Sequence, residues 1–209
     1  MSVKRLWMVA FLAVLITSWN ALAQENQIAG TIGRTFISDQ GIKGATFENP
    51  VVHFGNGLTF EVNYARHILG SGFTKVYVEV PAVFNLDEDL NAGGNSVPEG
   101  YKSIFVTPAI KANFFANTAI QPWVTFGGGW GYFKPSDQLV FGGPNPGSST
   151  NTGVLQMGLG LDVRIRPRWT LRGGVRDFWS GAPDLNVDTG HSRQHNYFVS
   201  GGIAWSFGK

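Results

Sequence analysis

The segment HSRQHN at residues 191–196 contains the residue types that a hydrolase needs. It has two histidines, His191 and His195, and a hydroxyl group on Ser192. A histidine that is oriented by a carboxylate can activate a serine as a nucleophile. The carboxylates nearby in the sequence are Asp177, Asp184 and Asp188. However, His191 and Ser192 are adjacent, so an extended strand would point them to opposite faces. We therefore expect Asn196 and its neighbours to form a polar loop tip, and the protein not to be an enzyme.

Three further patterns resemble binding motifs but lack the spacing that binding requires. The acidic stretch at residues 85–89 does not have the EF-hand pattern, so we expect it to solvate a loop rather than to bind a divalent cation. His53 and His67 stand alone, and the chain has no cysteine, so we expect no metal and no cofactor. The glycine run at residues 127–131 lacks the Lys-Ser/Thr ending of a phosphate-binding loop.

Composition indicates which elements must position these residues. The chain of 209 residues contains 28 Gly and 28 aromatic residues, but only 14% of its residues are charged. Disordered segments have few aromatics and many charges, and glycine destabilises helix interiors, so both a disordered chain and a helical bundle are excluded. A β-rich domain remains.

Alternation of apolar and polar residues predicts eight strands. The clearest example is residues 153–165, where every second residue is large and apolar and the others are small, polar or charged. The eight predicted strands cover residues 27–37, 57–66, 73–84, 101–115, 120–133, 153–165, 169–179 and 194–207. Most have about 10 to 13 residues, a length that suits tilted strands crossing a bilayer better than strands of soluble sheets.

The predicted connections alternate in length. Three are tight, at residues 67–72, 116–119 and 166–168, and four are long, at residues 38–56, 85–100, 134–152 and 180–193. Short turns at one end and long loops at the other are typical of outer-membrane barrels. The sequence therefore predicts an all-β fold, an eight-stranded antiparallel up-and-down transmembrane β-barrel. A secreted soluble barrel with its apolar face inside is the alternative.

Aromatic residues on the apolar face favour the membrane over the soluble barrel, because Trp and Tyr prefer the headgroup boundary. One predicted belt, near the tight turns, comprises Tyr64, Phe114, Trp169, Trp205 and Phe207. The second, near the long loops, comprises Phe84, Trp130, Tyr132, Trp179 and Tyr197. The core aromatics of a soluble barrel have no reason to separate into two bands.

The opposite face of the strands predicts a narrow lumen that contains charges of both signs. The expected acidic members are Glu61, Glu79 and Asp162, and the basic ones are Lys111, Arg164, Arg172 and Arg176. Buried charges must be paired and hydrogen-bonded, so we expect a salt-bridge network in which Arg172 and Arg176 meet Glu61 or Glu79. Such a network would plug the lumen; a gated ion path is the alternative.

Three residues disagree with the pattern. Arg34 falls on the apolar face of the first strand, Pro81 interrupts the third strand, and Pro108 lies on the apolar face of the fourth. Proline cannot donate a hydrogen bond to the sheet, so we expect a bulge or a strand end at each proline, and a bulge would shift the alternation beyond it.

The first 23 residues have the layout of a secretory signal peptide. Lys4 and Arg5 precede an apolar run, and Ala21 and Ala23 supply an A-x-A cleavage site. Residues 24–209 then form the barrel domain. Removing the signal peptide takes two basic residues from sixteen and leaves 14 against 14 acidic residues, so the formal charge falls from +2 to zero. A nucleic-acid partner is therefore not expected.

The end of the chain carries a resemblance to a known family. Ile203, Trp205 and Phe207 alternate in the final segment, and this pattern resembles the terminal signal by which the barrel-assembly machinery recognises its substrates; Gly208 and Lys209 follow it. The segments QPWVTFGGGWGYF and GLDVRIRPRWTLRGGVRDF resemble hairpins of small bacterial outer-membrane barrels of the OmpA transmembrane-domain and OmpX type.

That resemblance implies location in the bacterial outer membrane, contact with its lipid, and delivery by periplasmic chaperones to the assembly machinery. Such barrels include structural proteins, adhesins, small pores and a few lipid-modifying enzymes. We expect a structural role or surface interaction through the four long loops, whose ligand the sequence does not identify. A narrow porin-like pore is one alternative, and an enzyme that modifies lipid A in the outer leaflet is another.

Overall fold

A computed structural model describes residues 25–46 and 49–208, and every regular element within them is a β-strand. The predicted signal peptide, residues 1–23, lies outside the described residues. Within the described part of the chain, no helix is long and apolar enough to cross a membrane.

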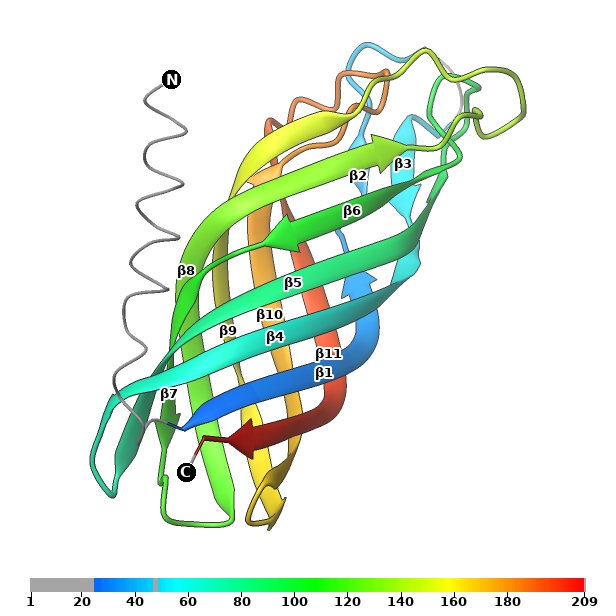
Figure 1. Ribbon diagram of the computed structural model, residues 1–209. Coiled ribbons are helices and arrows are strands. Elements are labelled where there is room, and N and C mark those ends of the chain that lie inside the picture. Colours follow the sequence, from blue (N-terminus) through cyan, green and yellow to red (C-terminus); the bar gives the residue numbers. More distant parts are fainter. Residues whose placement is uncertain (1–24, 47–48, 209) are drawn as a thin grey trace, which may run out of the picture.

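The strands form one closed antiparallel sheet (Figure 1). Its strands are β1 (Asn26–Phe36), β4 (Asn56–Gly70), β5 (Thr74–Asn91), β6 (Gly100–Val106) continued by β7 (Ala109–Phe114), β8 (Ile120–Pro135), β9 (Thr150–Arg166), β10 (Trp169–Gly181) and β11 (Arg193–Phe207). Each pairs with its neighbour in sequence, and β1 also pairs with β11 from Asn26↔Phe207 to Phe36↔Tyr197, which closes the ring. Because β6 and β7 together occupy one position, the predicted eight-stranded barrel is confirmed.

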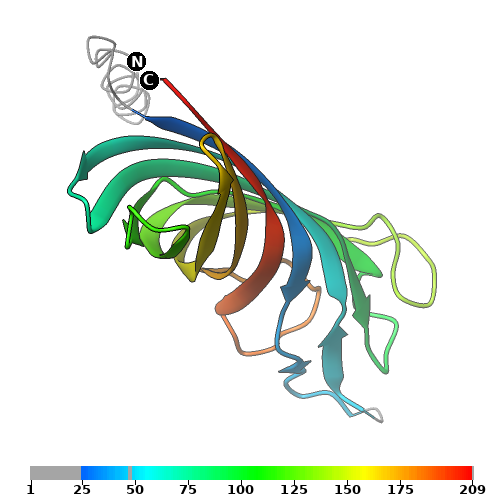
Figure 2. The same cartoon turned by 90° about the horizontal axis from the view of Figure 1, so that it is seen from below.

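The two ends of the barrel differ in their connections. Three short turns, at residues 71–73, 115–119 and 167–168, lie at one end, which we call the turn end. The longer connections lie at the opposite end, the loop end, and the first of them contains the short strands β2 (Gln40–Gly41) and β3 (Val51–Phe54). The start of β1 and the end of β11 both lie at the turn end, and Figure 2 shows the strands curving round when viewed from there.

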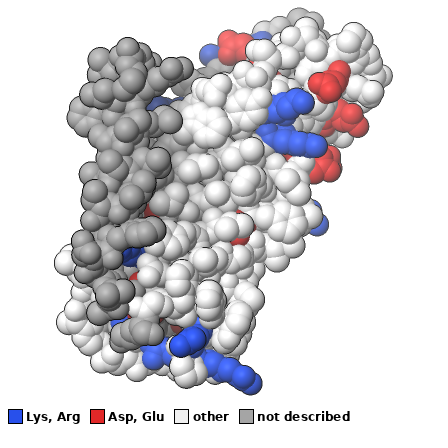
Figure 3. Space-filling view, viewed as in Figure 1, with Lys and Arg blue, Asp and Glu red and all other residues white. Residues whose placement is uncertain are grey.

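Side chains alternate between the lumen and the outer surface along the long strands, apart from a register shift in β5 between Asn85 and Glu88. On β8, Trp123 and Thr125 are buried in the lumen, whereas Val124 and Phe126 are exposed outside. The outer surface is therefore an apolar band. Figure 3 shows charged side chains gathered mainly at the two ends of the molecule, with few between them.

The strand end predicted at Pro108 is confirmed, whereas Pro81 is neither a bulge nor a strand end; the register of β5 against β6 shifts further along, between Asn85 and Glu88. Thr107 and Pro108 separate β6 from β7, yet the pairs Val106↔Trp130 and Ala109↔Gly127 keep the same register against β8. Pro81 lies within an uninterrupted β5, and its carbonyl accepts a hydrogen bond from the Thr107 amide at 3.3 Å. A missing proline donor interrupts the ladder locally, but no residue is inserted.

Arg34 points outward, as its parity predicted, and its guanidinium is not left unsatisfied. Nη1 donates to the carbonyl oxygen of Asn56 at 2.6 Å, towards the loop end of β4. An arginine on an apolar surface commonly extends its head group towards a polar boundary in this way.

Candidate functional site

The most concentrated set of chemical groups lies inside the barrel, where two clusters of buried charges meet. The first is centred on Arg176 of β10. Its Nε lies 3.1 Å from Oε2 of Glu61, and its Nη1 lies 2.8 Å from Oε1 of Glu79. Asn63 and Thr125 also donate hydrogen bonds to Glu79. Arg176 thus contacts both glutamates that the sequence placed beside it.

The second cluster is centred on Asp162 of β9, whose two oxygens accept four hydrogen bonds. Lys111 Nζ and Asn113 Nδ2 each lie 2.9 Å from Oδ2, and Arg172 contacts Oδ1 and Oδ2 at 2.8 Å. Arg172 also donates to Gln27 Oε1. Arg172 therefore pairs with Asp162, and not with Glu61 or Glu79, because Arg172 and Asp162 are opposite each other on paired strands.

Trp123 joins the two clusters. The centre of its ring lies 5.2 Å from Lys111 Nζ and 5.1 Å from the Arg176 guanidinium, so it makes cation–π contacts with both. A Cβ atom at either Gly160 or Gly174 would lie 2.5 Å from this ring. Glycine is needed at both positions because the indole occupies the space that a side chain would fill.

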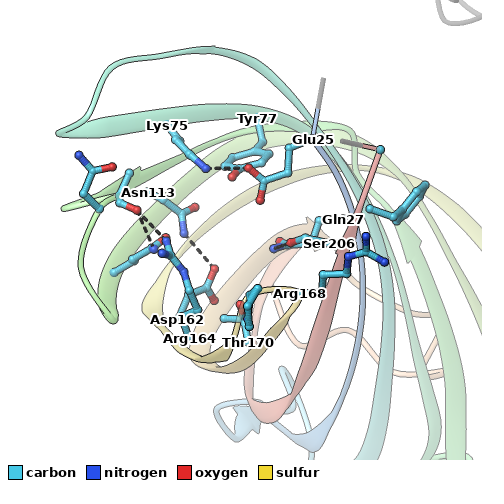
Figure 4. A pocket seen from close by; sticks show the side chains of 16 residues that line it. Glu25, Gln27, Lys75, Tyr77, Asn113, Asp162, Arg164, Arg168, Thr170 and Ser206 are labelled. Carbon is cyan, nitrogen blue, oxygen red and sulfur yellow. Dashed lines mark hydrogen bonds and ion pairs between the residues drawn. The ribbon is translucent and has the colours of Figure 1, made fainter. Parts of the chain in front are cut away.

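Arg164 is not part of this network. It is exposed at the turn end, and its Nη2 donates to the carbonyl of Ala116 at 2.7 Å; within the described residues it makes no ion pair. It lines a vestibule of about 310 Å³ that opens at the turn end, together with Lys75, Glu25 and Asp162 (Figure 4). Lys75 and Glu25 form an ion pair of 2.6 Å across part of this opening. Arg164 lies near the end of its strand, where the lumen meets solvent.

The loop-end half of the lumen is filled by aromatic and aliphatic side chains, which the sequence reasoning missed. Phe105 stacks on Phe178 with ring centroids 5.2 Å apart, and Phe133 packs edge-on against both Phe105 and Tyr101. We call Tyr101, Phe105, Phe133, Phe178 and Phe198 the aromatic plug; all are at most 3% exposed. The sequence pattern could have predicted this plug, since each of these residues lies an even number of positions from polar lumen residues of the same strand.

Glu88 is the buried acid nearest the loop-end opening, and it corrects the expected loop at residues 85–100. β5 continues to Asn91, so the acidic stretch is part of a strand: Asp87 and Asp89 are exposed outside, whereas Glu88 is buried. Oε2 of Glu88 accepts hydrogen bonds from the Gly57 amide and from Asn85. Exposed charges on both sides place this part of β5 beyond the apolar band.

The environment of Glu88 predicts a pH dependence of folding. Burial raises the pKa of the Glu88 carboxyl to about 7, and the charges of Asp87 and Asp89 act in the same direction. The unfolded carboxyl has a pKa of about 4.3. The stabilisation linked to its protonation is therefore fully present below that value and is lost as the pH rises through about 7.

We expect the wild-type barrel to lose on the order of 2 kcal/mol of stability between pH 5.5 and 8.5 relative to Glu88→Gln. Urea unfolding in detergent micelles, followed by tryptophan fluorescence, measures the difference. Glu99→Gln removes an exposed carboxylate and should retain the wild-type dependence. Parallel pH profiles for wild type and Glu88→Gln would contradict the prediction.

The predicted aromatic belts lie on the outer surface. Tyr64, Trp130, Trp169 and Tyr197 are between 40% and 45% exposed there. The other belt residues, Phe84, Phe114, Tyr132 and Trp179, share their outward parity and are partly exposed. At the turn end, Trp205 and Phe207 stack with ring centroids 5.0 Å apart, and Ile203, which precedes them in β11, is exposed on the same face. All three residues of the terminal signal belong to β11.

The segment at residues 191–196 brings together only part of the hydrolase arrangement. Nδ1 of His195 lies 2.7 Å from Oδ2 of Asp177, a carboxylate that the sequence offered as a partner. Ser192 contacts neither of them, and no hydroxyl group of the described residues hydrogen-bonds to His195. Asp184 instead accepts from the Ser148 amide, and Asp188 from the Gly190 amide. Asn196 points inward and donates to Ser180 and to the carbonyl of Phe178.

The isolated histidines have local partners. His53 Nδ1 lies 2.7 Å from Oδ2 of Asp39, and the ring of His67 packs against Tyr77 with centroids 5.4 Å apart. Across the described ranges, no group of three His, Cys, Asp or Glu residues is arranged to hold a metal ion.

Comparison with known proteins identifies the fold. No model of a protein family matches the sequence, and no curated protein matches it. Among solved structures, it is similar to the outer membrane protein OprG from Pseudomonas aeruginosa, with a TM-score of 0.55 and 13% identity over 88% of this chain and 96% of that one. It is also similar to Neisserial surface protein A, with a TM-score of 0.52 and 12% identity over 88% of this chain and 97% of that one. At such identities the likeness shows the fold alone: that of a small bacterial outer-membrane β-barrel.

Proposed function

We propose that this protein resides in the bacterial outer membrane as a closed, non-enzymatic barrel with a structural or surface-interaction role. One observation supports this most directly: the outer face of the closed sheet is an apolar band, whereas a filled lumen contains the buried charges of Glu61, Glu79, Lys111, Asp162, Arg172 and Arg176. A soluble barrel would place these two faces the other way round. Only the four connections at the loop end would then reach the cell exterior.

The experiment for this proposal is fractionation of cells that express the full chain, followed by electrophoresis of heated and unheated samples. We expect the mature chain, cleaved after residue 23, in the outer-membrane fraction. It should need detergent for extraction, and its unheated form should migrate differently because folded barrels resist the gel detergent. A mature chain that stays in solution without detergent would overturn the proposal.

The contents of the lumen favour a closed barrel over a pore. The two charge clusters occupy its middle, and the aromatic plug fills its loop-end half. We expect purified barrels in planar bilayers to show no steady conductance above the bilayer baseline. A steady conductance that changes with Arg172→Ala or Glu79→Ala would instead support the ion-pore alternative.

Over the part of the chain that the structure describes, no hydroxyl group hydrogen-bonds to His195 of the Asp177–His195 pair, so the enzyme alternative is not favoured. We therefore expect expression of the protein to leave the mass spectrum of lipid A unchanged. A mass change that disappears with His195→Ala or Ser192→Ala would overturn the non-enzymatic part of the proposal.

We further propose that the barrel-assembly machinery recognises the end of β11. Trp205 and Phe207 are stacked on its outer face and are available to the barrel-assembly machinery before β1 pairs with β11. We expect Phe207→Ala to lower the assembled, heat-modifiable fraction at least several-fold in cells and to leave refolding into detergent nearly unchanged. An equal loss in both settings would indicate a folding role and not recognition.

A further inference from the structure

A small cavity at the loop end lies apart from the lumen clusters. It has a volume of about 190 Å³ and lies between the segment that follows β1 and the start of β11. Its polar lining includes Asp39, Gln40, His191, Arg193, His195 and Tyr197. Three of these residues are basic or can become cationic, so the lining suits an anion.

The outward side chains beside the cavity form a stack. The Arg193 guanidinium lies 4.5 Å from the centre of the Trp179 ring. The Trp179 ring stacks on His195 at 6.3 Å, and His195 stacks on Tyr197 at 5.6 Å with an angle of 6° between their planes. The stack holds the Arg193 guanidinium and the His195 imidazole against the same Trp179 ring on the outer surface, so ring contacts fix the orientation of both.

Asp177 fixes the orientation of the imidazole more closely. A carboxylate only accepts hydrogen bonds, so Nδ1 of His195 donates to Asp177 at 2.7 Å and Nε2 remains for another partner. Among the described residues, no carboxylate forms an ion pair with the Arg193 guanidinium, and no group hydrogen-bonds to Nε2 of His195. The Arg193 guanidinium is thus available to donate to a ligand, and Nε2 of His195 can donate as well when the imidazole ring is protonated.

One acidic residue lines the same cavity, but its oxygens are occupied. Asp39 accepts from Nδ1 of His53 at 2.7 Å and from the Phe54 amide at 3.1 Å. Both Asp39 oxygens are therefore already engaged by hydrogen bonds from the segment around β3.

The position of the cavity identifies the source of the anion. From Tyr197 towards the turn end, the outward residues of β11 include Val199 and Ile203, which are 45% and 49% exposed and belong to the apolar band. The stack therefore lies where the band ends, at the depth of lipid head groups. An anion at this depth and on this face belongs to a lipid.

We propose that Arg193 and His195 bind the phosphate of a lipid head group in the outer leaflet, with Trp179 and Asp177 as positioning residues. This inference rests on the proposed outer-membrane function. Arginine binds phosphate through charge-assisted hydrogen bonds, and the lipid's acyl chains would continue along Tyr197 and Val199.

Native mass spectrometry of the mature barrel, refolded and delipidated in detergent, tests the proposal by titration with diphosphoryl lipid A. We expect Arg193→Gln/His195→Gln to bind at least about tenfold more weakly than wild type, because two charge-assisted contacts are lost. Lys102→Gln/Lys134→Gln removes two exposed cations elsewhere on the loop end and should bind as wild type does. Neutral diacylglycerol should not bind measurably.

Each other outcome overturns the inference. Equal affinity of wild type and the Arg193/His195 variant would show that the site is not used, and an equal loss in both double variants would show attraction by general surface charge alone. Competition by millimolar inorganic phosphate would identify free phosphate as the ligand. All variants are first tested on gels for a heat-modifiable barrel. If the outer-membrane proposal is wrong, the wild-type chain will form no such barrel, and this result is distinct from a loss of lipid binding.

Discussion

Replacing Asp162 with asparagine is expected to destabilise the barrel by about 3–5 kcal/mol. The carboxylate accepts hydrogen bonds from Lys111, Asn113 and Arg172, and all of these groups are almost completely buried. The substitution preserves shape but leaves two buried cations without their anion. Urea unfolding in detergent micelles measures the difference in the free energy of unfolding between wild type and variant. The dependence of that free energy on urea concentration should be the same for both proteins.

Asp137→Asn is the matched control, since it removes the same charge from an exposed position at the loop end. We expect it to change stability by less than about 0.5 kcal/mol. A similar small change for Asp162→Asn would mean that the buried cluster is hydrated and contributes little, and the account of the lumen as a closed charge network would then be wrong.

Truncation of Phe178 to alanine is the second large effect, with an expected loss of about 3–5 kcal/mol. This ring is 1% exposed and stacks on Phe105 within the aromatic plug. The variant would leave a cavity in the lumen that rigid strands cannot collapse to fill. The same urea titration measures this loss, with heat-modifiability on gels as the check that a barrel has formed.

Phe141→Ala removes the same atoms from a loop residue that is 65% exposed. Its cost should stay below about 1 kcal/mol. If Phe178→Ala cost no more than Phe141→Ala, the plug would be loosely packed, and the expectation of a barrel without conductance would lose its main support.

Strand positions and side-chain facing were predictable because the alternation of β-strands is local. The pattern from Leu155 to Leu161, for example, assigns one face of β9 without reference to any other strand. The strand end predicted at Pro108 was correct, and the alternation continues beyond it because proline removes a donor without adding a residue, so the flanking pairs with β8 keep the register. The extension of β5 through Glu88 was missed because charged residues continue a strand when their partners, β3 and β6, are present.

The charge partners could be predicted only in part. Parity alone assigned Glu61, Glu79, Asp162, Lys111, Arg172 and Arg176 to the lumen, and all six are buried there. Which cation meets which carboxylate depends on the register between strands, so the pairing of Arg172 with Asp162 required the closed sheet. Arg164 shares the inward parity but lies close to the strand end, where solvent replaces a partner.

The amino-acid sequence by itself determined the number of strands, their order, and the face on which apolar residues lie, because these depend on residue type and local spacing. Only the tertiary structure decided what fills the lumen and what lies side by side at its ends. The aromatic plug, the indole of Trp123 between two cations, and the stack of Arg193 with His195 join residues from different strands, and such contacts depend on register and closure. Inter-strand distances, and not local periodicity, decide them.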